Sequence, residues 1–189
     1  MKFSLSFRIW HWLNAIIVLG LLGTVFLRQT FLSWKNNAEI LTAKLLEMDI
    51  EITQSQAKIL GKAIRAEMWD WHIILGYGLA LLVLFRVYLY FKDSSTKESF
   101  NSLSLHKKVV HISYYLLNIA LVVIAVTGLV IHFYQELGIV KDTAHDIKEI
   151  HELAYILILY FVPLHILGVI IAENRDEKGI ISRIVNGKE

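Results

Sequence analysis

Apolar residues along this chain are concentrated in four long runs that polar segments separate. The runs cover about 9–27, 71–91, 109–133 and 151–172. A helix needs roughly 20 apolar residues to cross the hydrocarbon layer of a membrane, and each run meets that requirement. The pattern therefore predicts an all-α integral membrane protein, a four-helix up-down bundle in which residues 1–189 form a single transmembrane domain.

The connection between the first two runs, residues 28–70, is long and has a pattern of its own. Between residues 38 and 69, apolar side chains such as Ile40, Leu45 and Ile52 recur at helical spacing among charged ones. This spacing predicts an amphipathic helical outer loop at the membrane surface. Two roles fit such a loop: a cap over the bundle, or a docking surface for a partner subunit on 38–69.

Composition narrows the chemistry that the protein can carry. Hydrophobic residues make up 56% of the chain and there is a single proline, so most of the surface must meet membrane lipid rather than water. The net charge of +2 is too small to indicate a nucleic-acid partner. Without any cysteine, the chain cannot form disulfides, thiolate metal sites, iron–sulfur clusters or covalent haem links. Any metal must be held by nitrogen or oxygen.

Basic residues indicate the orientation of the spans. Lysines and arginines gather near both ends of the chain and in the connection between the second and third runs, whereas the third connection carries only Lys141 and Lys148. Since the more basic side of a membrane protein faces the cytoplasm, we expect both termini to be cytoplasmic.

Histidines recur at two depths of the predicted bundle. His151 and His165 are fourteen residues apart, which places them about 40° apart around a helix and about 21 Å apart along it. His72 begins the second span at the depth of His151, and His11 lies in the first span at the depth of His165. Antiparallel spans thus predict an outer pair, His72 with His151, and an inner pair, His11 with His165.

Glycines and arginines accompany these histidines. Gly76 and Gly168 each lie about one turn after a histidine, where the missing side chain leaves room for a flat ring. Arg8 and Arg86 lie at the inner depth and are candidates to neutralise the carboxylates of a bound cofactor. Arg86 is also near enough to the interface to extend its guanidinium there, and the sequence leaves both roles open.

Paired neutral imidazoles in an apolar seam suit bis-histidine haem b better than other metal centres. Zinc requires a third or fourth ligand, and a di-iron carboxylate site requires glutamates inside the spans, and the sequence supplies neither at these depths. Two axial nitrogen ligands leave haem iron no open position, which favours electron transfer over oxygen chemistry.

Three motifs in these spans also occur together in a known family. The motifs are Arg8-x-x-His11-Trp12, His72-x-x-x-Gly76 with Arg86, and His151-Glu152 with His165. In them the chain resembles the bacterial cytochrome b561 and Ni-Fe hydrogenase cytochrome b-subunit superfamily. The resemblance implies two haem b groups held by His11, His72, His151 and His165. It also implies electron transfer across the bacterial cytoplasmic membrane between the quinone pool and a partner redox protein or small acceptor.

Other functions stay open at this stage. The chain could be the membrane anchor and electron conduit of a separate dehydrogenase or hydrogenase, or a haem-free transporter whose histidines relay protons. If it is an enzyme in its own right, it is a quinone-linked oxidoreductase. The roles of His111 and His132 are unassigned, and with Asn14 and Tyr114 they are the polar candidates for contacts to a quinone.

Overall fold

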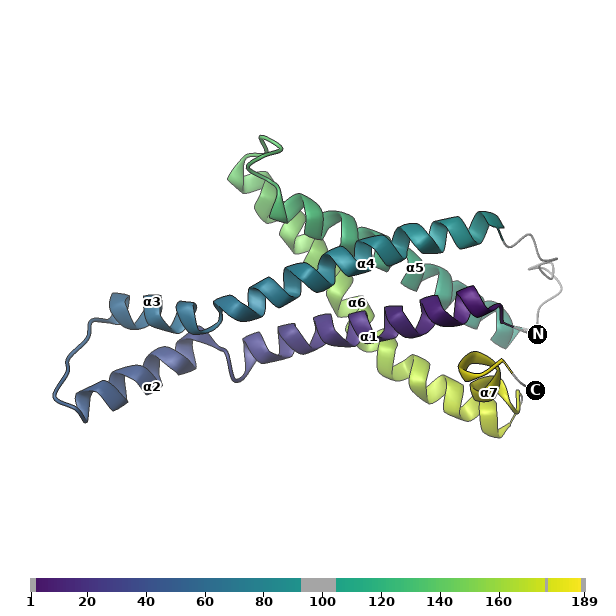
Figure 1. The fold of residues 1–189 in the computed structure, drawn as a ribbon, viewed down its shortest axis with the longest axis horizontal. Coiled ribbons are helices and arrows are strands. Elements are labelled where there is room, and N and C mark those ends of the chain that lie inside the picture. The colour runs from purple at the N-terminus through teal and green to yellow at the C-terminus, as the bar shows by residue number, and fades with distance from the viewer. Residues whose placement is uncertain (1–2, 93–104, 176, 188–189) are drawn as a thin grey trace. The chain divides into compact units, whose positions relative to one another are not determined.

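In the described part of the chain, the regular secondary structure is α-helix. The computed structural model describes residues 3–92, 105–175 and 177–187, and this part contains no strand (Figure 1). The helices are α1 (Leu5–Gln29), α2 (Trp34–Leu46), α3 (Gln54–Ile64), α4 (Ala66–Lys92), α5 (Leu105–His132), α6 (Lys141–Asn174) and α7 (Ile180–Val185). The predicted all-α class is confirmed.

Four of these helices, α1, α4, α5 and α6, are long and apolar enough to cross a membrane. Most of their side chains are not buried by protein: Leu81 and Phe91 of α4, for example, are 67% and 76% exposed. In water, such surface would cost about 25 cal/mol per Å², whereas lipid tails accept it without penalty. The chain is a multi-pass membrane protein.

The helices belong to two compact units, and each is described here by itself. The first unit comprises residues 1–15 and 77–189, and the second comprises residues 16–76. In the first unit α5 and α6 pack along each other. The turn between them closes at Gly138, which has a φ of 67° and donates its N–H to the carbonyl of Gln135. The left-handed conformation at this position favours glycine.

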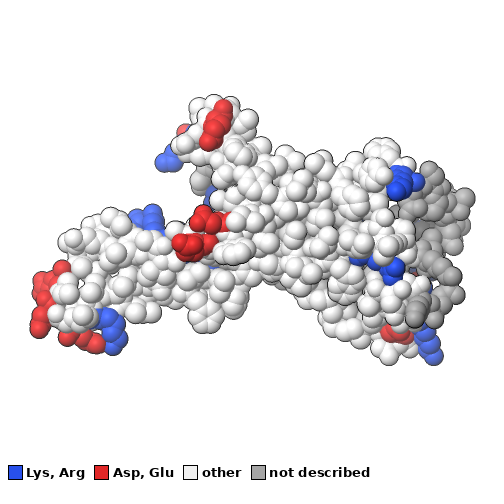
Figure 2. Space-filling view, in the orientation of Figure 1, with Lys and Arg blue, Asp and Glu red and all other residues white. Residues whose placement is uncertain are grey.

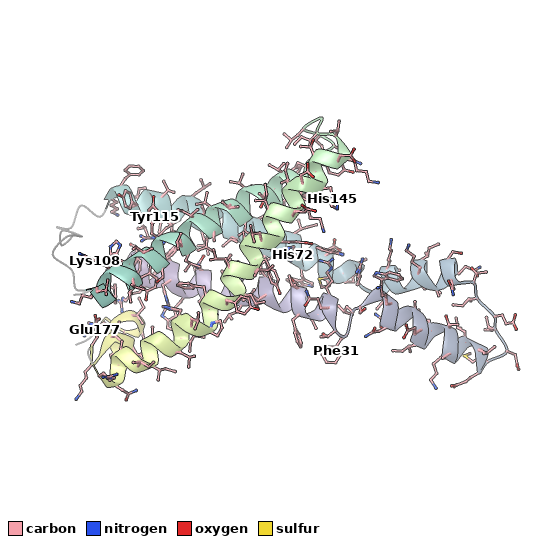
Figure 3. The ribbon with its side chains drawn as sticks, turned by 180° about the vertical axis from the view of Figure 1, so that it is seen from behind. Phe31, His72, Lys108, Tyr115, His145 and Glu177 are labelled. Carbon is pink, nitrogen blue, oxygen red and sulfur yellow. The ribbon has the colours of Figure 1, made fainter. Side chains whose placement is uncertain are left out.

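Helix α6 is 34 residues long and begins at Lys141, well before the predicted span. Its first turns are polar, and Figure 3 labels His145 there. The side chains of Lys148 and Glu152 form an i,i+4 ion pair of 2.7 Å, an arrangement that supports exposed helices. Pro163 lies inside the helix, which continues past it to Asn174.

The C-terminal helix α7 is held in the first unit by hydrogen bonds to Glu173 and Trp12. The Glu173 carboxylate accepts bonds of 2.9 Å from the N–H groups of Gly179 and Ile181, at the start of α7. At its other end, Trp12 Nε1 donates to the carbonyl of Ile184 over 3.2 Å. The end of α7 therefore lies against the beginning of α1.

In the second unit, α2 and α3 form a helical hairpin (Figure 1). They approach closely at Gly61, where a Cβ atom would lie only 2.5 Å from the backbone oxygen of Trp34. Thr53 begins α3 with a capping box that it shares with Gln56. The two helices confirm the predicted helical character of 38–69. Acidic side chains gather at the tip of the hairpin in Figure 2, in the segment 47–51.

Candidate functional site

The structure brings the rings of the predicted inner pair together. His11 comes from α1 and His165 from α6, both within the first unit. Their ring centroids are 6.3 Å apart and the ring planes are inclined at 58°. An imidazole nitrogen lies about 2 Å from a first-row metal that it binds, so two imidazoles on opposite sides of one metal have centroids about 6 Å apart. The separation of His11 and His165 has this magnitude.

Polar atoms without partners line the same face of α1. Arg8, His11 and Asn14 follow one another at intervals of three residues, which places them on one side of the helix. Arg8 Nε, His11 Nδ1 and Asn14 Oδ1 are buried and have no hydrogen-bond partner among the described residues. Buried polar atoms are costly unless they are satisfied. This stripe therefore fits a ligand that has polar groups of its own.

The His165 ring lies between two aromatic side chains. Phe161, one turn earlier on α6, stacks on it with centroids 5.7 Å apart and planes 12° from parallel. The Tyr114 hydroxyl from α5 lies 3.4 Å from His165 Nδ1, at the long end of hydrogen-bond distances. These neighbours restrict the rotation of the ring.

The Arg86 guanidinium lies over two aromatic rings of α1. Its guanidinium carbon lies 5.2 Å from the ring centroid of Phe7 and 5.0 Å from that of Trp10. Trp10 is 7% exposed, and its Nε1 donates a 2.9 Å hydrogen bond to the carbonyl of Leu82. Cation–π contacts of this kind hold a guanidinium in place. The positive charge is thereby fixed near the first turns of α1, close in sequence to His11.

His72 lies in the second unit and contacts α1 there (Figure 3). Its Nδ1 is 2.7 Å from Thr24 Oγ1, and its ring meets Trp69 edge to face at 5.5 Å. Thr24 is only 6% exposed. The same two helices border a mostly apolar groove of about 440 Å³ whose lining includes Gly20, Gly23 and Thr24, a size typical of ligand pockets.

His151 has a matching environment in the first unit. Its Nδ1 lies 3.0 Å from Thr127 Oγ1 of α5. The next residue, Gly128, approaches so closely that a Cβ atom there would lie 3.2 Å from His151 Cε1. The sequence Thr127-Gly128 thus gives His151 both a hydrogen-bond partner and room for its ring.

The remaining predicted residues lie apart from these contacts. No described atom comes within 4 Å of a Cβ built on Gly76 or on Gly168, so both positions are open. His132, at the end of α5, meets the edges of Tyr77 and Phe133 at 5.8 and 4.6 Å. His111 lies in α5.

The sequence did not single out the hydroxyl partners of the histidines, Thr24 and Thr127, or the partner of Arg86, Trp10. A polar residue inside an apolar span is the signal that points to the threonines. Within the described part of the chain, no group of three or more His, Asp or Glu residues is placed to hold one metal ion. In the same part of the chain, His11 and His165 are the pair of histidines whose rings lie in contact.

These features define a multi-pass membrane protein with imidazoles set inside its spans. The family profile of the prokaryotic cytochrome b561 proteins matches residues 2–187, almost the whole chain, and the chain belongs to that family. No curated protein and no solved structure matches it. As a member of this family, the chain is a membrane electron-transfer protein that binds haem b. The neutral nitrogen donors and the orphaned polar stripe of α1 fit such a group.

Proposed function

We propose that the chain binds two haem b groups and passes electrons across the bacterial cytoplasmic membrane, between the quinone pool and a partner redox protein or small acceptor. His11 and His165 hold the inner group, and His72 and His151 hold the outer one. The observation that carries the proposal is the 6.3 Å separation of the His11 and His165 rings, which suits two imidazoles on one iron.

Each proposed ligand residue contributes a neutral imidazole nitrogen from inside a span. A haem b held in this way supplies reversible one-electron transfer, because its iron has no open position. Two residues on the inner side also match the acidic edge of such a group. Arg8 and Arg86 supply positive charge there, and Arg8 Nε is a buried donor without a partner among the described residues.

The residues around the outer pair support the same assignment. His72 and His151 each direct Nδ1 to a threonine hydroxyl. Ligand histidines usually use their second nitrogen in this way, to fix the ring. Gly76 and Gly168 leave open space one turn beyond His72 and His165, as a flat ligand requires.

A second function, electron conduit for a separate dehydrogenase or hydrogenase, is favoured by the α2–α3 hairpin. Ile40 and Ile59 are more than half exposed on its helices, and its tip is acidic (Figure 2). An apolar surface with a charged end is suited to a partner subunit. On this alternative, residues 38–69 dock the redox partner, and both termini remain on the cytoplasmic side.

The experiment that tests electron transfer uses proteoliposomes with trapped ferricyanide. A quinol analogue added outside gives up two electrons and two protons per molecule, and two ferricyanide ions inside take one electron each. The proposal predicts ferricyanide reduction well above that of protein-free liposomes. A His165→Ala protein should lose most of this rate. Equal rates with and without the wild-type protein would reject transmembrane electron transfer.

A further inference from the structure

We propose that Thr24 and Thr127 are positioning residues that fix the tautomer of His72 and His151. Each hydroxyl holds the ring proton on Nδ1, so that the lone pair is on Nε2, the nitrogen that would bind the iron. This inference rests on the proposed haem ligation by these two histidines. Thr24 and Thr127 do not touch the cofactor; they act on it through His72 and His151.

The hydrogen bonds of Thr24 favour one assignment of protons. Its Oγ1 lies 2.6 Å from the carbonyl oxygen of Leu21 and 2.7 Å from His72 Nδ1. A hydroxyl has one proton to donate, and a carbonyl oxygen can only accept. The Thr24 proton therefore goes to Leu21, and Thr24 Oγ1 accepts the proton that His72 carries on Nδ1. A neutral imidazole protonated at Nδ1 has its lone pair on Nε2.

Thr127 repeats this arrangement on α5. Its Oγ1 donates to the carbonyl oxygen of Val123 over 2.6 Å and lies 3.0 Å from His151 Nδ1. The hydroxyl proton again goes to the backbone, where the Ile124 carbonyl 3.3 Å away is a second acceptor, and this favours donation by His151 from Nδ1. The backbone of Ile124 is also a hydrogen-bond partner of the His151 ring. The two contacts lie in different units and come from different helices, which means that the same solution arises twice independently.

The opposite tautomer is unfavourable at both positions. With the proton on Nε2, the Nδ1 lone pair would face the lone pairs of the threonine oxygen, whose proton is donated to a backbone carbonyl. The threonine could relieve this contact only by breaking its hydrogen bond to that carbonyl. A buried contact of that kind is unfavourable, because neither atom then has a proton to share. Thr24 is buried, and the His151 ring fits beside Gly128, where a side chain would crowd it. The threonines thus select the ligating nitrogen before any metal binds.

Among the described residues, neither histidine of the inner pair has a threonine hydroxyl at its Nδ1, so the inner haem serves as an internal reference. His11 Nδ1 has no partner among the described residues, and the Tyr114 hydroxyl lies 3.4 Å from His165 Nδ1. Donation from Nδ1 increases the electron density on Nε2 and so favours oxidised iron. Loss of a threonine hydroxyl should therefore raise the midpoint potential of the outer haem and leave that of the inner haem unchanged.

Valine substitutions test the inference, because valine has the shape of threonine without the hydroxyl. In Thr24→Val and in Thr127→Val, we expect about a 10–100-fold loss of haem affinity at the outer site. In the haem that remains bound at that site we expect a raised midpoint potential and changed g-values in the ferric electron paramagnetic resonance spectrum. Thr24→Ser and Thr127→Ser keep the hydroxyl and should restore both readouts.

Thr30→Val is the matched control, because Thr30 Oγ1 donates to the Phe26 carbonyl over 2.7 Å and contacts no histidine. It should leave potentials and spectra unchanged. If a valine variant does not accumulate, the alanine variant at that position removes the same hydroxyl. Wild-type potentials and g-values in the hydroxyl-free variants would overturn the inference while the proposed function stands. Fewer than two haems in the wild-type protein would instead overturn the proposed function and this assignment with it.

Discussion

The imidazole rings of His11 and His165 lie 6.3 Å apart, although one comes from the first long helix and the other from the last. Nothing in the local sequence of either histidine requires this. It results from the tertiary arrangement of the first unit, to which both histidines belong. Because the separation suits a shared metal, it makes the roles of individual histidines testable.

Removal of one inner histidine should eliminate one haem and leave the other. In His11→Ala or His165→Ala we expect about half of the wild-type haem content, with the b-type absorption bands retained at lower intensity. His145→Ala is a suitable control, because His145 is exposed in the first turns of α6, where it pairs with Glu149. Pyridine haemochrome assays against protein concentration give the count. Full haem content in both inner-histidine variants would exclude them as ligands.

Replacement of Arg86 by leucine should lower the midpoint potential of the inner haem, because a nearby positive charge favours the reduced form. A partly buried charge interaction of about 1 kcal/mol corresponds to roughly 40 mV for a one-electron couple. Arg86→Lys keeps the charge and should shift the potential much less. Redox titration of the visible bands measures both. An unchanged potential in the leucine variant would count against Arg86 as a counter-ion.

The hairpin of α2 and α3 should depend on the absence of a side chain at Gly61. A methyl group there would lie 2.5 Å from the Trp34 carbonyl, so we expect Gly61→Ala to destabilise the hairpin by about 1–3 kcal/mol. Limited proteolysis in detergent should then cut between residues 30 and 66 faster than in the wild type. Gly23→Ala is the control, since its Cβ meets no described atom within 4 Å. Equal cleavage rates in the two variants would contradict the close packing.

The positions of basic residues predict that the C-terminus is cytoplasmic. A fluorescent protein fused after residue 189 should therefore be bright in cells, and an alkaline phosphatase fused at the same point should be inactive. Fusion at residue 50, in the connection between α2 and α3, should give the reverse result. High phosphatase activity from the C-terminal fusion would reverse the orientation of all four spans.

Much of the fold could be predicted because membrane spans depend mainly on length and apolarity. The four runs predicted from the sequence all lie in long helices. The early start of α6 could not be predicted in this way. Its first turns are polar and depend on side-chain pairs such as Lys148 with Glu152, which leave no apolar run to detect.

The candidate site was predictable where helix geometry alone determines it. The spacing of His151 and His165, with the depth of His11, anticipated the contact that the inner pair makes. Thr24 and Thr127 could not be identified from the sequence, because their significance depends on contacts with another helix. The setting of Arg86 was left open for the same reason, since its position is determined by Phe7 and Trp10 of α1.

The central claim is that this single chain holds two haem b groups, each between two histidines. The most direct measurement is a reduced-minus-oxidised visible spectrum of the purified protein, combined with a pyridine haemochrome count. We predict two low-spin b-type haems per chain. A protein that purifies without haem, or with high-spin bands that show an open iron position, would contradict the account.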